Sequence, residues 1–216
     1  MSQGNRTRIY LVRHGTTEWN KGEIFRGQVD CRLNETGRAE ARALALSFQD
    51  VPIDGICSSP LARAMETAQP IARIKGLSVT PHPAFIDLHF GEWQGLPLAS
   101  VQEKYSTLYR IWREKPEEIA FPGGESLAAV TARAWEGLQR LVQENRGRTV
   151  MIVTHRVITK ILICALLGLN NSHFWRIQQG TTAVNCFDYT GKAYNAVFIN
   201  DTCHLKSLPA GAGKAD

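Results

Sequence analysis

Short apolar runs rich in β-branched residues alternate with longer helical patterns along this chain of 216 residues. Such alternation is typical of an α/β fold with a largely parallel sheet, because parallel strands need long crossover connections and are buried on both faces. No internal repeat, low-complexity tract or linker interrupts the pattern. We therefore expect a single domain over residues 1–206, with a mostly parallel central sheet flanked by helices, and a flexible C-terminal tail over residues 207–216.

The expected bounds of the individual strands and helices follow from composition and from the residues that typically begin and end helices. Strands are expected where the apolar runs are short, at residues 8–12, 53–58, 77–80, 149–154, 183–189 and 193–199. Helices are expected at residues 37–48, 60–76, 105–113, 126–144 and 157–167. In the second of these, Ser59 can cap, Pro60 suits the first helical position and Gly76 ends the helix. Pro70 within the same pattern predicts a kink or a break.

Charge and cysteine content argue against several classes of protein. The 25 Lys and Arg residues exceed the 20 Asp and Glu residues by only five and are spread along the chain, which disfavours a nucleic-acid partner. The five cysteines are scattered, without zinc-ligand spacing, so we expect reduced thiols. The sequence also has no carboxylate-rich metal site, and we expect no metal or cofactor. His155, Arg156 and Lys160 interrupt the longest apolar stretch, which therefore does not predict a membrane span. We expect a cytoplasmic protein.

Polar side chains follow three of the expected strands at the points where those strands end. Arg13 and His14 follow the first strand, Arg63 lies just beyond the second, and His155 follows the fourth. Ligands of open parallel sheets bind beyond the carboxyl ends of the strands, where these side chains would converge. Any one of them alone is more often structural. Together, two imidazoles and two guanidiniums suit a dianion, and phosphate oxygens match guanidinium geometry. Glu66, Lys160 and Arg133 are expected to be ordinary helix-surface charges.

An ordered set of segments strengthens this hypothesis. The segments are LVRHGTTEWN, FRGQVDCRLNETGRAEA, SSPLARAMETA, DLHFGEWQG, FPGGES and VTH. In this order they resemble the histidine phosphatase (phosphoglycerate mutase-like) superfamily. The resemblance implies a three-layer α/β sandwich in which His14 accepts the phosphoryl group. It implies that Arg13, Arg63 and a cationic His155 surround the phosphate, and that Asn20 and Gln28 bind the substrate.

The chain departs from the family pattern at two positions. The family usually has Glu four residues before the Gly of its FG pair, as the acid that protonates the leaving oxygen, and here Asp87 stands at that position. We expect Asp87 to act as acid and then as base toward water. Many relatives have Gly where this chain has Arg156. That guanidinium either reaches a second acidic group on the substrate or forms a surface ion pair, and both readings stay open.

A closer likeness concerns the C-terminal half. The segments FPGGESLAAV, HRVITKILICALLGLNNSHFW and NDTCHL resemble the metal-independent phosphoserine phosphatase and alpha-ribazole phosphatase branch. This likeness implies that His204 lines the non-phosphate end of the substrate, although a loop histidine without a ligand is an equally good reading.

The expected function is metal-independent hydrolysis of a phosphomonoester, a small phosphorylated metabolite, through phosphohistidine at His14. A bisphosphoglycerate-dependent phosphoglycerate mutase is the first alternative, disfavoured because the interval 95–123 is too short to shield a phosphohistidine from water. A weakly active phospholigand-binding protein, suggested only by Asp87, is the second. The leaving group stays open among serine, glycerate, a ribazole-type nucleoside and sugars. A homodimer through apolar strands or helices is a further expectation.

Overall fold

Six strands form one sheet in the computed structural model, which describes residues 6–208. The strand order is β3-β2-β4-β1-β5-β6. The strands are β1 (Thr7–Arg13), β2 (Gly55–Ser58), β3 (Val79–Pro81), β4 (Thr149–Thr154), β5 (Val184–Tyr189) and β6 (Tyr194–Asp201). The helices are α1 (Glu18–Lys21), α2 (Glu35–Ser47), α3 (Ala62–Lys75), α4 (Leu98–Lys104), α5 (Ser106–Glu114), α6 (Leu127–Glu144) and α7 (Arg156–Leu166).

The sheet is mostly parallel, as the alternation of strands and helices predicted. β1 pairs in parallel with β4, β4 with β2 and β2 with β3. β5 runs antiparallel to both β1 and β6, so it is the strand that points the opposite way. The short connection between β5 and β6 requires these two strands to be antiparallel, because a tight hairpin can only join antiparallel strands.

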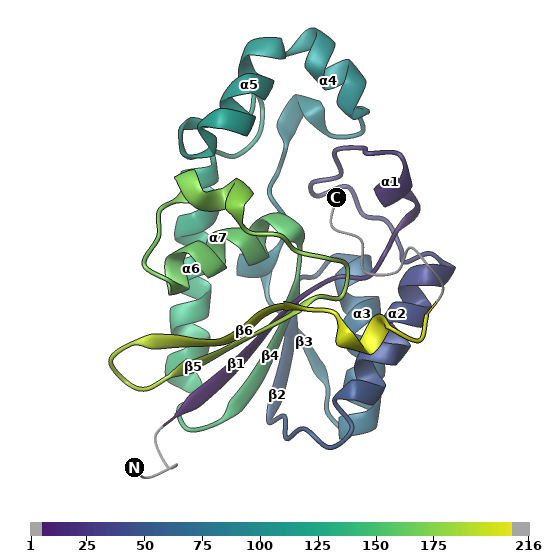
Figure 1. The fold of residues 1–216 in the computed structure, drawn as a ribbon, viewed down its shortest axis with the longest axis vertical. Helices are drawn as coiled ribbons and strands as arrows, with labels where there is room; N and C mark the ends of the chain where they lie inside the picture. Colours follow the sequence, from purple (N-terminus) through teal and green to yellow (C-terminus); the bar gives the residue numbers. More distant parts are fainter. Residues whose placement is uncertain (1–5, 209–216) are drawn as a thin grey trace.

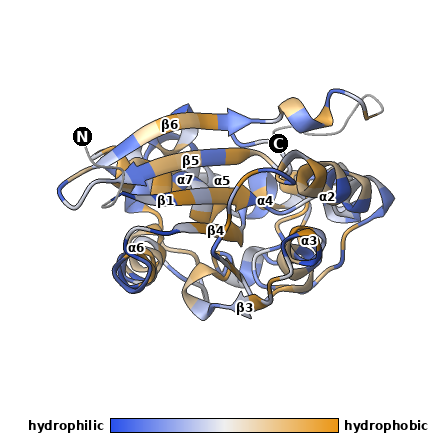
Figure 2. Ribbon diagram, turned by 90° about the horizontal axis from the view of Figure 1, so that it is seen from below, coloured by the Kyte–Doolittle hydropathy of each residue, from blue (hydrophilic) through white to orange (hydrophobic). Residues whose placement is uncertain are grey.

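Helices cover both faces of the sheet, which makes three layers (Figures 1 and 2). An apolar core lies between the sheet and the helices on each face. Alternate residues of β1 point to opposite faces, so Ile9 and Leu11 pack with α6 and α7, whereas Tyr10 and Val12 pack with α2 and α3. Both sets are buried, as expected of a central strand in an α/β fold. The predicted three-layer α/β sandwich is confirmed. The single-domain boundary at residue 206 stays a prediction, and the predicted tail lies outside the described residues except for Ser207 and Leu208.

The start of α3 differs from the sequence prediction. The helix begins at Ala62 rather than at Pro60, because the Ala62 amide finds its acceptor in the carboxylate of Asp30, 2.8 Å away. Ser59 lies before the helix and does not cap it, and its Oγ accepts from the Leu61 amide at 3.3 Å. Pro70 does not break α3, which continues to Lys75 and ends at Gly76 in the left-handed conformation (φ +64°), as predicted.

A helical layer that the sequence only partly predicted lies above the carboxyl edge of the sheet (Figure 1). It consists of α4, which was not predicted, and α5. Four buried aromatic side chains form the core beneath these helices: Phe90, Trp93, Trp112 and Phe121. Among the described residues, no helix is both long and apolar enough to cross a membrane.

Candidate active site

The carboxyl ends of β1 and β4 bring two buried histidines together. The His14 amide donates to the Thr154 carbonyl at 2.8 Å, which ties the end of β1 to the end of β4. The two imidazole rings lie 5.3 Å apart between centroids and are nearly free of solvent contact. His155 Nε2 contacts Ser59 Oγ at 2.7 Å, so the end of β2 joins the same site. The structure thus places these segments as the strand-end argument predicted.

The turn after β1 fixes the tautomer of His14. Its Nδ1 lies 2.7 Å from the carbonyl oxygen of Gly15. A carbonyl oxygen only accepts, so Nδ1 carries the proton and Nε2 keeps its lone pair. The turn is held by buried Glu40, which accepts from the Thr16 amide at 2.8 Å. A side chain at Gly15 would lie 2.8 Å from the Gly37 carbonyl, so the close approach of α2 requires glycine here.

Arg63 and Asp87 form a buried pair beside the histidines. The fully buried guanidinium of Arg63 donates to the Gly27 carbonyl at 2.7 Å and to Asp87 Oδ2 at 3.2 Å. The same carboxylate oxygen lies 3.6 Å from His155 Nδ1, an atom that has no hydrogen-bond partner among the described residues. Asp87 therefore stands between a cation and an imidazole. Arg13, also fully buried, donates to the Gln179 carbonyl at 2.7 Å.

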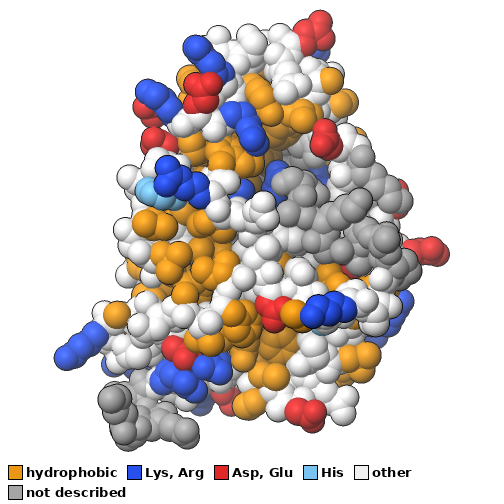
Figure 3. Space-filling view, in the orientation of Figure 1, with side chains coloured by type: hydrophobic (Ala, Val, Ile, Leu, Met, Phe, Trp, Pro, Cys, Tyr) orange, Lys and Arg blue, Asp and Glu red, His pale blue; other side chains and the backbone are white. Residues whose placement is uncertain are grey.

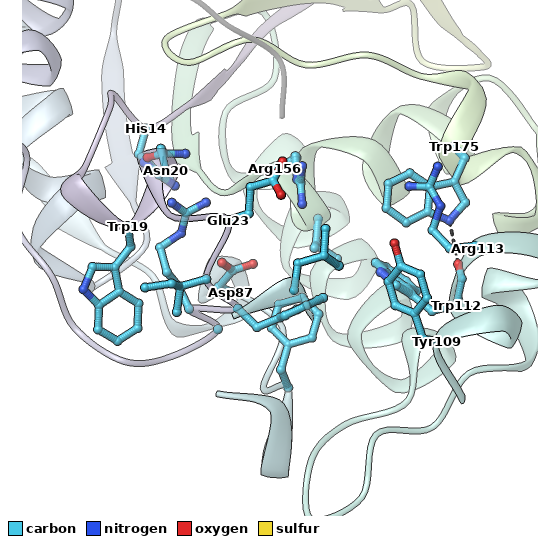
Figure 4. Close-up of a pocket in the computed structure, with 17 residues that line it drawn as sticks. His14, Trp19, Asn20, Glu23, Asp87, Tyr109, Trp112, Arg113, Arg156 and Trp175 are labelled. Carbon is cyan, nitrogen blue, oxygen red and sulfur yellow. Dashed lines mark hydrogen bonds between the residues drawn. The ribbon is translucent and has the colours of Figure 1, made fainter. Parts of the chain in front are cut away.

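A cavity of about 190 Å³ opens beside this cluster (Figure 4). His14, Asn20 and Asp87 line one end of it, and Arg156 lies between them and an aromatic wall. The wall consists of Tyr109, Trp112 and Trp175, with Arg113 beside them. The cavity thus joins a polar, cationic end to an apolar end, as is usual for small-molecule sites.

Burial and neighbouring cations set the protonation of the site. Burial lowers the pKa of His14 well below its ordinary value, and Arg63, Arg13 and Arg26 lower it further, so the ring is neutral. The pKa of His155 is likewise held well below its ordinary value, mainly by burial and Arg63. The cationic state of His155 expected around a bound phosphate stays a prediction. Burial raises the pKa of Asp87 against the opposing field of Arg63, which favours the protonated acid.

Two of the predicted substrate-binding residues lie elsewhere. The side-chain amide of Gln28 donates to the backbone carbonyl of Asp87 at 3.0 Å, which braces the loop rather than facing the cavity. His204 Nε2 contacts Thr182 Oγ1 at 3.0 Å and does not line the cavity. Asn20 and Arg156 do line it. Asn20 also accepts from the Thr17 amide at 2.8 Å, a contact that shapes the turn around His14.

Sequence reasoning misjudged the positions of two charged residues, Arg133 and Lys160, and overlooked a third, Arg26. Arg133 was expected on the surface, but it donates to the carbonyls of Ala84, Ile86 and Asp87 and to the carboxylate of Glu125. Lys160 was also expected on the surface, but it is only 4% exposed. Glu66 is partly exposed and accepts from the Leu33 amide at 3.0 Å. Arg26 was overlooked, although it lines the cavity and donates to Thr17 Oγ1 at 3.3 Å.

The side chains of the described residues also bear on whether this chain has a metal site. Within residues 6–208, no three His, Cys, Asp or Glu side chains are grouped as a metal ion would require. The five cysteines are free.

Comparisons with known proteins agree with this geometry. A family model described as histidine phosphatase superfamily (branch 1) matches residues 9–202. Phosphoserine phosphatase 1 of Hydrogenobacter thermophilus is 35% identical over 208 residues, which cover 96% of this chain and 99% of that protein. The structure of YhfR from Bacillus stearothermophilus has a TM-score of 0.89 and 28% identity, covering 93% of this chain and 100% of the other. A mutant phosphoserine phosphatase of Entamoeba histolytica in complex with phosphoserine has a TM-score of 0.84 and 27% identity, covering 92% and 99%.

Proposed function

Since the chain belongs to the histidine phosphatase superfamily (branch 1) and is a phosphomonoester phosphatase, we propose that His14 carries the transferred phosphoryl group. The observation that carries this proposal is the neutral, buried imidazole of His14, whose Nδ1 proton is held by Gly15 and whose Nε2 lone pair is available. A nitrogen nucleophile needs this state, because a protonated ring cannot attack phosphorus.

The first step transfers the phosphoryl group to the protein. His14 Nε2 forms a bond to phosphorus while the bond from phosphorus to the leaving oxygen breaks. Asp87, in its protonated form, gives its proton to that oxygen, so that a neutral alcohol departs. Arg63 and Arg13 are buried beside the histidines, where their charge stabilises the phosphoryl oxygens without reorganisation.

The second step returns the histidine to its starting state. Water attacks the phosphoryl group, Asp87 accepts a proton from that water, and the bond between phosphorus and Nε2 breaks. Inorganic phosphate leaves and both side chains regain their original protonation. We propose that His155 gains a proton only when the dianion binds, because a nearby negative charge raises the pKa of an imidazole.

The proposed reaction needs no metal, because the guanidiniums supply the charge that Mg²⁺ supplies to many other phosphoryl-transfer enzymes. The test is release of phosphate from phosphoserine, phosphoglycerate, sugar phosphates and an aryl phosphate, each measured with a chelator and with added Mg²⁺. We expect turnover of at least one small phosphomonoester that the chelator leaves unchanged. Turnover that requires added metal would contradict metal independence, and tight phosphate binding without turnover would favour a binding protein.

We retain two further expectations as proposals. Val197, Phe198 and Ile199 of edge strand β6 are between 37% and 49% exposed, and apolar side chains are visible on the face that carries β6 (Figure 3). They offer apolar surface for the proposed homodimer. Light scattering of the purified protein would give the mass of a dimer, and a monomer mass at micromolar concentration would contradict it. A cytoplasmic location also stays a prediction.

A further inference from the structure

Ser59 carries a buried hydroxyl beside the histidines that the proposed chemical steps do not use. It directly follows β2 and is fully buried. Its Oγ lies 2.7 Å from Nε2 of His155, which is also fully buried, so the two groups are hydrogen-bonded. A hydroxyl and a neutral imidazole can each donate or accept, so the distance alone does not give the direction of this bond.

The neighbours of Ser59 decide that direction. The Leu61 amide donates to Ser59 Oγ at 3.3 Å, which occupies one lone pair of the oxygen. Within residues 6–208, the only other hydrogen-bond partner of this oxygen is His155 Nε2. If His155 donated, the hydroxyl proton of Ser59 would be buried without an acceptor, which is unfavourable in a protein interior. Ser59 therefore donates, and the lone pair of His155 Nε2 accepts.

This direction places the proton of the His155 ring on Nδ1. The ring is neutral because burial and Arg63 hold its pKa well below the ordinary value, so it carries one proton, and Nε2 must stay bare to accept. Nδ1 has no acceptor among the described side chains and carbonyls, since Asp87 Oδ2, at 3.6 Å, is too distant for a hydrogen bond. A buried donor is thus left for a ligand.

The two histidines of the site share one tautomer but leave opposite groups available. In His14 the Gly15 carbonyl, which can only accept, takes the Nδ1 proton at 2.7 Å and leaves the bare Nε2 to react. In His155 the Ser59 hydroxyl takes the bare Nε2 and leaves the Nδ1 proton to donate. The chemical type of the partner, carbonyl or hydroxyl, therefore separates a nucleophile from a hydrogen-bond donor.

A hydroxyl suits the position of Ser59 better than a carboxylate or a carbonyl would. A partner that can only accept would hold the proton of His155 on Nε2. The bare Nδ1 would then face the phosphoryl oxygens, and two atoms with lone pairs repel each other. A hydroxyl donates to the neutral ring and can turn to accept from Nε2 when the ring gains a second proton. Ser59 can thus serve both protonation states of His155.

We propose that Ser59 is a positioning residue that fixes the proton of His155 on Nδ1, and that this N–H donates to an oxygen of the transferring phosphoryl group. The proposal rests on the phosphatase function proposed above and adds a residue to it. Ser59, His155 and Asp87 are the residue types of a hydrolase triad, but the fully buried Ser59 does not line the cavity. Ser59 therefore acts only through His155.

The ring nitrogens of His155 report the position of the proton directly. In ¹⁵N-labelled protein, the chemical shifts and one-bond proton couplings distinguish a nitrogen that bears a proton from one that bears a lone pair. His155→Gln identifies the signals by their loss. We expect a protonated Nδ1 and a bare Nε2 in the ligand-free wild type at neutral pH. A proton on Nε2 would overturn the proposal.

Removal of the hydroxyl should change both the tautomer of His155 and the turnover. In Ser59→Ala we expect a proton shared between the two ring nitrogens. We also expect kcat to fall at least about tenfold, the size of one hydrogen bond to a charged group. Ser59→Thr keeps a hydroxyl and should restore the Nδ1 proton signal and most of kcat. Ring signals and kcat that both stay unchanged in Ser59→Ala would also overturn the proposal.

Ser58 supplies the matched control. It is the preceding residue, is as fully buried as Ser59, and donates to the Ser59 carbonyl at 2.9 Å rather than to an imidazole. Ser58→Ala should leave the His155 signals and kcat close to those of the wild type. If both serine variants lose kcat equally while the ring signals of His155 stay unchanged, Ser59 is structural and the proposal is contradicted.

The two proposals fail in different ways, because the tautomer of His155 is measured without a substrate. If no phosphomonoester is hydrolysed, the phosphatase proposal fails even where Nδ1 carries the proton. If phosphomonoesters are hydrolysed while His155 carries its proton on Nε2, the phosphatase proposal stands and the role of Ser59 is contradicted.

Discussion

His14 and Asp87 line the same cavity, yet burial moves their pKa values in opposite directions. The reason is that burial disfavours whichever form is charged, so it favours the neutral imidazole and the protonated carboxyl. A neutral nucleophile and a protonated acid are the pair that the first chemical step requires. At the scale of single residues, the proposed mechanism therefore depends on where these side chains are buried.

Removal of the Asp87 carboxyl should lower kcat/KM most for substrates with poor leaving groups. We expect Asp87→Asn to lower kcat/KM for an alkyl phosphate by about 10²- to 10⁴-fold. The loss should be much smaller with p-nitrophenyl phosphate, whose leaving oxygen needs no proton. Wild-type kcat/KM should fall as pH rises through the raised pKa of Asp87, and the variant should lack that decline. Asp50→Asn, at an exposed position after α2, is the control. Equal losses on both substrates would exclude proton donation.

At the scale of elements, the loop that carries Asp87 is held by the segment before α6. A side chain at Gly91 would lie 1.9 Å from the Pro122 carbonyl oxygen, and one at Gly124 would lie 2.3 Å from the His89 carbonyl oxygen. Arg133 of α6 adds bonds to three carbonyls of the loop. Because Asp87 is one methylene shorter than Glu, its carboxyl reaches the site only if this loop is correctly placed.

Two glycines of this loop allow a matched comparison. Gly91 and Gly95 both have positive φ, +55° and +83°, but a side chain at Gly95 would have no atom within 4 Å. Gly95→Ala should therefore cost only the backbone strain, about 1–2 kcal/mol. Gly91→Ala should cost more, because backbone atoms must also move. Urea denaturation measures both variants, and equal costs would contradict the packing described here.

Loss of the Arg133 brace should impair catalysis without removing any group that touches the substrate. We expect Arg133→Gln to lower kcat by up to about 10²-fold, since a displacement of about 1 Å has effects of this size. Arg140→Gln, which breaks an exposed ion pair on the same helix, is the control and should change kcat little. A normal kcat in Arg133→Gln would show that the loop holds its position without the brace.

The sequence predicted the elements with the strongest local signals and missed those that depend on tertiary contacts. Every residue of the run at residues 149–154 is either β-branched or apolar, and β4 has these same bounds. Helix α4 was missed because its seven residues provide less than two turns of amphipathic pattern. Lys160 and Arg133 were misjudged for a related reason. A charge at a helical position looks exposed until the aromatic rings or carbonyls that cover it are known.

At the scale of the whole molecule, the sheet gathers residues that are distant in the sequence. The parallel register of β1, β4 and β2 brings His14, His155 and Ser59 to one edge. The meeting of the two histidines could be predicted from the sequence, because both follow the carboxyl ends of parallel strands. The aromatic end of the cavity could not, because α5 and the 3-10 helix that carries Trp175 meet only in the folded chain. Buried histidines at such an edge also affect the stability of the entire fold.

Acid should destabilise the protein before its carboxylates titrate. His14 and His155 have folded-state pKa values well below the unfolded value of about 6.5, so only the unfolded chain takes up protons as pH falls below that value. Each histidine should lower the free energy of unfolding by up to about 1.4 kcal/mol per pH unit. His82 and His204 shift in the same direction but are less buried. Asp87 acts oppositely, because its raised pKa lets the folded protein take up a proton before the unfolded chain does.

Denaturant titrations at pH 7.5 and below would measure this slope. His155→Gln should reduce this slope by up to the contribution of one proton, about 1.4 kcal/mol per pH unit. Inorganic phosphate should offset part of the lost stability, because it binds only the folded state. A free energy of unfolding that stays constant below pH 6.5 would contradict the buried, neutral histidine pair.

The central claim is a covalent phosphoryl group on His14, and rapid-quench labelling tests it most directly. The protein is mixed with a ³²P-labelled phosphomonoester, quenched in alkali within milliseconds and digested for mass spectrometry. We predict an acid-labile, alkali-stable phosphate on the peptide that contains His14, formed and lost at rates consistent with turnover. Turnover without any label on His14, or label on another side chain, would contradict the account.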